Sequence, residues 1–159
     1  MNVAPPAFAT LGPGWTVADE DSEGELGVRL AFEEWMDPKA AATLAAGWGG
    51  DRGVLVMNGD RAAFAWRLRY DPGKTKDELS SKAWTGLTKA LDGALGRATV
   101  DRPSFVCRER PDRGPIAFAR AGADIVVVLG PARTVTSGWT SAGDCALSRR
   151  WTAEIAASP

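Results

Sequence analysis

Between residues 53 and 70 the apolar side chains recur with a period of two, and this rhythm constrains the fold more than any other feature of the chain. The first run ends at Asn58-Gly59, a dipeptide that favours a two-residue hairpin turn. In the second run, large apolar residues alternate with smaller or charged ones: Phe64, Trp66, Leu68 and Tyr70. The alternation predicts an antiparallel hairpin whose aromatic side faces the core and whose other side, with Arg67 and Arg69, faces solvent.

Four segments show the spacing of amphipathic helices instead. Their expected ranges are residues 23–36, a second helix from Pro38, then residues 76–95 and 144–157. Asp37 before Pro38 fits an N-cap followed by the first helical position. The acidic run near residue 20 is interpreted as the start of the first helix, with Ser22 and Glu25 as a capping box.

A second β region follows the third helix. Strands are expected over residues 104–110, 116–120 and 125–129, and residues 130–142 are expected to form a loop. The element order is then ααββαβββα, and strands that follow one another in pairs indicate the α+β class. We therefore predict an extended arm over residues 1–15 and a single α+β domain over residues 16–159. In it, helices pack on one face of an antiparallel sheet of about five strands.

Composition narrows the possible functions. The chain has 159 residues, which is enough for one domain with a substantial core, and it lacks the run of about 18 apolar residues that would span a membrane. Histidine is absent, which excludes His-dependent triads, His general bases and His metal ligands. A net charge of −1 lacks the basic excess typical of nucleic-acid binders. We therefore expect no nucleic-acid partner, no cofactor and no metal site.

The glycine-rich stretch over residues 47–52 is the most unusual in the chain. A glycine loop cradles phosphate when it opens a helix, whereas this stretch follows a helix and leads into a strand. One interpretation is a tight connection, with Trp48 in the core and Asp51 paired to a nearby backbone amide or arginine. The alternative is a ligand site, and the arginine side of the hairpin is a second candidate for binding an anion. The candidate ligand-binding residues are Trp48, Asp51, Arg52, Arg67 and Arg69.

Cys107 and Cys145 are the only two cysteines. They are either buried thiols in a reducing compartment or a disulfide that ties a strand to the last helix, and spacing alone does not decide between these. Neither fits a catalytic nucleophile, because the chain has no histidine to activate it.

Three stretches carry a family resemblance: residues 24–30 (Gly-Glu-Leu-Gly-Val-Arg-Leu), residues 45–52 (Ala-Ala-Gly-Trp-Gly-Gly-Asp-Arg) and the expected strand that ends at residue 70. They are similar to the C-terminal domain of a group of uncharacterised extracytoplasmic bacterial and archaeal proteins. In that group, the preceding segment resembles a zinc metallopeptidase. The resemblance covers residues 15–71, and the rest only by element order. It implies an accessory or binding role outside the cytoplasm and favours a Cys107–Cys145 disulfide, but it assigns no functional residue.

The first six residues lack the basic and apolar regions of a secretory signal. A complete chain would therefore be cytoplasmic, whereas a mature or excised piece would fit the extracytoplasmic family. The leading hypothesis for function is a non-catalytic binding or protein-interaction module whose partner is another protein or domain. The alternative is a remnant or subunit of a peptidase-like hydrolase whose catalytic part lies elsewhere.

Overall fold

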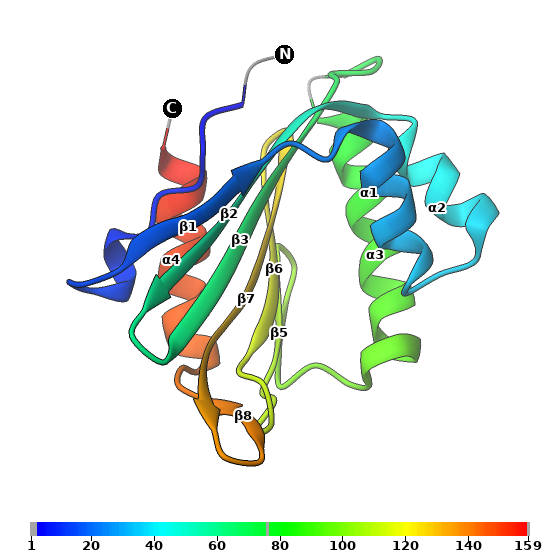
Figure 1. Cartoon of the computed structure of the whole chain (residues 1–159). Coiled ribbons are helices and arrows are strands. Elements are labelled where there is room, and N and C mark those ends of the chain that lie inside the picture. The colour runs from blue at the N-terminus through cyan, green and yellow to red at the C-terminus, as the bar shows by residue number, and fades with distance from the viewer. Residues whose placement is uncertain (1–2, 76, 159) are drawn as a thin grey trace.

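A computed structural model describes residues 3–75 and 77–158. A central antiparallel sheet is covered by α1 and α3 on one face, with α2 packed against these two helices, and by α4 on the other face (Figure 1). The helices are α1 (Gly24–Glu33), α2 (Pro38–Ala45), α3 (Glu78–Leu95) and α4 (Cys145–Ala157), with a short 3-10 helix at Ala9–Leu11. The strands are β1 (Thr16–Asp21), β2 (Trp48–Asn58), β3 (Arg61–Tyr70), β4 (Val100–Arg102), β5 (Phe105–Arg108), β6 (Ile116–Ala121), β7 (Asp124–Val135) and β8 (Gly138–Ser141).

The α+β class with an antiparallel sheet is confirmed, but the described part of the chain forms eight strands rather than about five. Their order is β1-β2-β3-β7-β6-β5-β4, and β8 pairs with the far end of β7. Strands β1, β4 and β8 were not predicted, and the residues where β7 ends and β8 begins were expected to form a loop. All residues of β1 are exposed, and β8 is exposed or half-buried. Such edge strands show no alternation of buried apolar residues, so their sequences carry no period-two signal.

The helices begin and end close to their predicted positions. The Asp37 side chain accepts hydrogen bonds from the amides of Lys39 and Ala40, which confirms the predicted cap of α2. The capping box of α1 is wrong, because α1 has no side-chain cap from its own segment and the Ser22 hydroxyl donates to the carbonyl of Asp51 instead.

The expectation that all helices cover one face is also wrong. Along β7, alternate residues enter two different cores: Ile125 and Val127 lie under α1–α3, whereas Val126 and Val128 lie under α4. A continuous run of β-branched residues is typical of a strand that is buried on both faces. As a consequence, Arg67 on the α4 face is not in solvent as predicted but only 2% exposed.

Two other interactions hold α4 against the sheet and the N-terminal arm. A disulfide joins Cys107 on β5 to Cys145, the first residue of α4, so the bonded alternative is the one found. The N-terminal arm also packs on α4, where the Trp151 indole donates to the carbonyl of Ala7 and the Glu154 carboxylate accepts from the amides at positions 9 and 10.

The α1–α3 face is covered at one end only. Along β3, Tyr70, Leu68 and Trp66 are buried beneath the helices, whereas Phe64 is only half-buried. In Figure 1 the end of the sheet that carries β8 extends beyond α1. There Leu129 on β7 is 36% exposed, so this end of the core face remains open to solvent.

Candidate functional site

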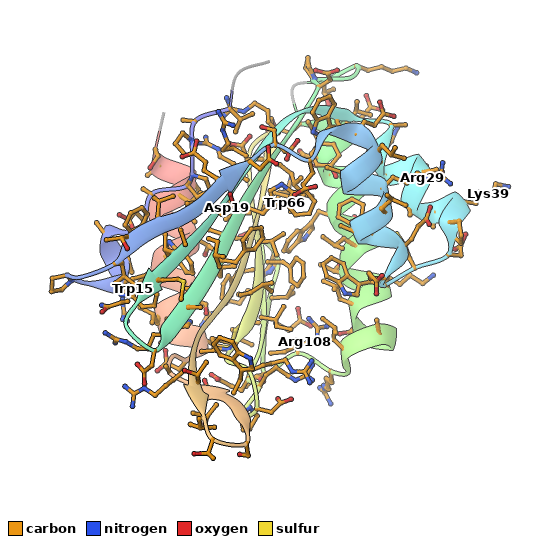
Figure 2. All side chains as sticks on the ribbon, viewed as in Figure 1. Trp15, Asp19, Arg29, Lys39, Trp66 and Arg108 are labelled. Carbon is orange, nitrogen blue, oxygen red and sulfur yellow. A yellow bond between two sulfur atoms is a disulfide. The ribbon has the colours of Figure 1, made fainter. Side chains whose placement is uncertain are left out.

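Asp51 lies on β2 beneath the start of α1 and is buried. Its carboxylate accepts four hydrogen bonds. Two come from backbone amides where α1 begins, Glu23 at 2.8 Å and Gly24 at 3.0 Å. The other two come from the indoles of Trp48 at 3.0 Å and Trp66 at 2.9 Å. Figure 2 shows Trp66 in the layer between the sheet and the α1–α3 helices.

These four bonds define what Asp51 does. A carboxylate has about four lone-pair positions, and here each carboxylate oxygen accepts two N–H groups. A negative charge at a helix N-terminus is also favourable, because the helix dipole is positive there. Asp51 therefore serves as a remote N-cap for α1 and fixes two tryptophans. Its pairing with backbone amides agrees with the tight-connection interpretation, but those amides belong to Glu23 and Gly24, which lie 28 and 27 residues away in the sequence.

Residues 48–52 of the glycine-rich stretch form the first part of β2, and Gly47 is a turn residue between α2 and β2. A bulge between Trp48 and Gly50 interrupts its pairing with β3. At Gly49 a Cβ atom would lie 2.6 Å from Asp71 Oδ1 and 3.2 Å from the Asp71 amide nitrogen, so a larger residue would displace the Asp71 side chain.

Arg67 and Arg69 share Asp124 on the α4 face. Arg67 Nε lies 2.8 Å from Asp124 Oδ2, and Arg69 binds both carboxylate oxygens at 2.7 and 2.9 Å. Burial opposes ionisation of Asp124, but the hydrogen bonds from both arginines outweigh it and lower the pKa of that carboxyl. The hydrogen bond to Asp124 likewise raises the pKa of Arg69. Arg67 also donates to the carbonyl of Ser158 just after α4, so this ion pair holds the end of that helix.

The five candidate residues do not form one site. Trp48 and Asp51 belong to the α1–α3 face, whereas Arg67 and Arg69 lie on the opposite face. Arg52 pairs with Arg67 across the β2–β3 ladder, and its side chain reaches Glu20 on β1 at 3.4 Å. These residues therefore lie in three separate places: Trp48 with Asp51, Arg67 and Arg69 at Asp124, and Arg52 at Glu20.

Arg108 is a buried charge that the sequence analysis did not single out. In Figure 2 it lies between the sheet and the end of α3. Its Nε donates to the carbonyl of Gly96 at 2.6 Å, and its Nη2 lies 2.6 Å from the Asp92 carboxylate. A cation is favourable at a helix C-terminus, where the dipole is negative. Arg108 therefore fixes the end of α3 as Asp51 fixes the start of α1.

The uncovered end of the α1–α3 face contains a recess of about 340 Å³, which we call the open groove. Its volume falls in the range of about 300–1,000 Å³ that is usual for ligand-binding clefts. Arg113 contributes a charge to a lining that is otherwise apolar. The main lining side chains come from β2, β3, β7 and β8: Leu55, Ala62, Phe64, Leu129, Ala132 and Trp139.

The open groove could not be predicted from the sequence, because its lining residues follow the same pattern as buried core residues. Leu55 and Phe64 pair across β2 and β3, and Phe64 pairs with Leu129 on β7, so the three form one row on the core face. Their alternation is the same as that of fully buried residues, and a period of two cannot show where helix cover ends. Trp139, which is 47% exposed, lies in the segment that was predicted to be a loop.

A family described as a domain of unknown function, DUF8575, matches residues 14–140, and the chain belongs to this family. The match begins just before β1 and ends within β8, so it includes Asp51 and the lining of the open groove but not α4. No curated protein and no solved structure matches the chain. Within the part of the chain that the structure describes, no helix is long and apolar enough to cross a membrane.

Proposed function

We propose that this chain is a non-catalytic interaction module that binds an apolar segment of a partner protein in the open groove. The observation that carries the proposal is the groove itself, a recess of about 340 Å³ that exposes Leu129 and Trp139 to solvent. Binding clefts are lined mainly by apolar and aromatic side chains, and tryptophan is enriched among the residues that dominate binding energy.

The use of the polar side chains supports the same proposal. The Asp51 carboxylate is occupied by four N–H donors, and the Asp124 carboxylate is occupied by two arginines. Arg108 is committed to the end of α3. These three buried charges hold helices in place, whereas the lining of the groove has no such role. Binding through apolar contact is therefore the function that the arrangement of side chains favours.

A neutral apolar probe tests the proposal. N-acetyl-leucinamide should be titrated into ¹⁵N-labelled protein while the amide and indole resonances are recorded. We expect the largest shifts at Trp139, Leu129 and Phe64, because the probe resembles one side chain of a docked segment. A Trp139→Ser variant should lose most of these shifts. Shifts spread evenly over the surface, or centred on α4, would contradict the proposal.

We further propose that the module works outside the cytoplasm, as the family resemblance implies. The Cys107–Cys145 disulfide supports this location, because disulfides persist in oxidising compartments. The test is alkylation of the protein in its native cells, followed by measurement of the intact mass. We expect no alkylation unless a reductant is added first, and two alkylated cysteines without reductant would argue for a reducing compartment.

A further inference from the structure

Helix α1 exposes two leucines one turn apart. Leu26 and Leu30 are 66% and 54% exposed, more than any other large apolar side chain in the described ranges. Residues four apart lie on the same side of a helix, and the opposite side of α1 carries the buried Val28 and Phe32. Leu26 and Leu30 therefore form an apolar ridge that points away from the core, and we call it the leucine ridge.

The surroundings of the leucine ridge are acidic. At about 100° per residue, Glu33 at the end of α1 and Glu34 just after it lie to either side of the ridge. Arg29 is the basic residue of this helix, and it pairs with Glu33 at 2.8 Å. The acidic character extends beyond α1, because residues 1–60 contain ten acidic and three basic residues, whereas residues 61–159 contain ten acidic and sixteen basic residues.

The residues that line the open groove belong to the basic part of the chain, residues 61–159, except for Leu55. Arg113 lines it, and Arg110 lies on the same connection between β5 and β6. Arg110 and Arg113 lie 3.7 Å and 2.7 Å from one carboxylate, Asp112, so these three side chains carry a net charge of +1. Glu109, on the same connection, accepts a hydrogen bond from the amide of Cys145 at the start of α4. The leucine ridge and the open groove are therefore complementary in shape and in charge. The ridge is an apolar projection with acidic residues around it, and the groove is an apolar recess with arginines at its edge.

We infer that the leucine ridge of one copy docks in the open groove of a second copy. This inference rests on the proposed function, since it names the occupant of the same groove. A symmetric contact is disfavoured, because ridge against ridge would oppose Glu33 and Glu34 with their own copies, and groove against groove would oppose Arg110 and Arg113. The contact is therefore head-to-tail, which builds closed rings or open chains.

Because the ridge consists of two leucine side chains, we expect an association of the weak class that buries less than about 1,200 Å². Its charged component is exposed to solvent and is screened by salt, since the Debye length falls from about 10 Å at 0.1 M to about 3 Å at 1 M. We expect the average mass in sedimentation experiments to rise with protein concentration at low salt. At 1 M salt the rise should be strongly reduced.

Two complementary variants test the inference. Leu26→Asp/Leu30→Asp removes the ridge and keeps the groove, whereas Trp139→Glu blocks the groove and keeps the ridge. Each should remain monomeric alone, because it has lost one of the two surfaces. An equimolar mixture should form a dimer and nothing larger, because only one ridge and one groove can meet. Val17→Asp is the matched control, since Val17 is 48% exposed but lies outside both surfaces, and it should associate as the unmodified chain does.

A charge exchange provides a second test that leaves the apolar side chains intact. Glu33→Lys/Glu34→Lys and Arg110→Glu/Arg113→Glu should each weaken self-association at least tenfold, and mixing the two should restore it. A native chain that stays monomeric at about 1 mM in low salt would overturn the inference, as would mixtures that remain monomeric. If N-acetyl-leucinamide still shifts the groove resonances, the proposed function survives that result. If the native chain stays monomeric and N-acetyl-leucinamide does not bind, both the inference and the proposed function are contradicted.

Discussion

The two ends of the α1–α3 face differ in how their side chains are used. At one end, α1 covers the sheet and the Asp51 carboxylate binds two helix amides and two indoles. At the other end, Leu129 and Trp139 remain open to solvent. Asp51 and Trp48, which were candidate ligand-binding residues in the sequence, therefore stabilise the fold. The open groove, where we propose that a partner binds, is lined mainly by apolar residues at the end of the sheet that α1 does not cover.

Replacing Asp51 should have the largest effect on stability. Asp51→Ala leaves four N–H groups without their acceptor, and we expect a loss of about 4 kcal/mol in the free energy of unfolding, measured by urea denaturation. Asp51→Asn keeps one acceptor oxygen and should lose about half as much. The control is Asp60→Asn, which removes an exposed ion pair with Arg133 and should change stability by less than about 1 kcal/mol. Equal losses of unfolding free energy in Asp51→Asn and Asp60→Asn would contradict a special structural role for Asp51.

Acidification should have an intermediate effect through Asp124. Because the arginines lower its pKa in the folded state, the ionised carboxylate stabilises the fold above the unfolded-state pKa of about 3.9. That stabilisation is lost as the pH falls through the lower folded-state pKa. We therefore expect stability to decline below about pH 4, with a shallower decline in Asp124→Asn. Identical slopes in the two proteins would show that Asp124 does not contribute.

Changes in the lining of the open groove should have the smallest effect on stability. Trp139→Ser removes a side chain that is half exposed, so we expect a change of no more than about 0.5 kcal/mol in unfolding free energy. Urea denaturation of this variant beside Asp51→Asn gives the comparison. A loss as large as that of Asp51→Asn would mean that Trp139 belongs to the core.

The fold could be predicted from the sequence where the periodicity of apolar residues within one helix or hairpin indicates that element. The hairpin around Asn58-Gly59 and the helix that begins at Cys145 both carry strong local periodicity, and both lie where they were expected. Strands β1 and β8 could not be predicted, because an exposed edge has no buried side to produce alternation.

The candidate site could not be predicted, because it depends on long-range packing. Asp51 bonds Glu23 and Trp66, which lie 28 and 15 residues away, so no local motif announces the cluster. Arg67 alternates as a solvent-facing residue would, and only the position of α4 on that face explains its burial. The open groove exists because no helix covers this end of the sheet, and the sequences of the strands that line it do not show where the helix cover ends.

The most direct test of the central claim combines binding and stability in the same two variants. N-acetyl-leucinamide titration and urea denaturation should be measured for Trp139→Ser and for Asp51→Asn. We predict that Trp139→Ser loses the probe-induced shifts and keeps its unfolding midpoint, whereas Asp51→Asn keeps the shifts and unfolds at lower urea. If Asp51→Asn abolished probe binding while still folded, or if Trp139→Ser left it unchanged, the division between a structural polar cluster and a binding groove would be contradicted.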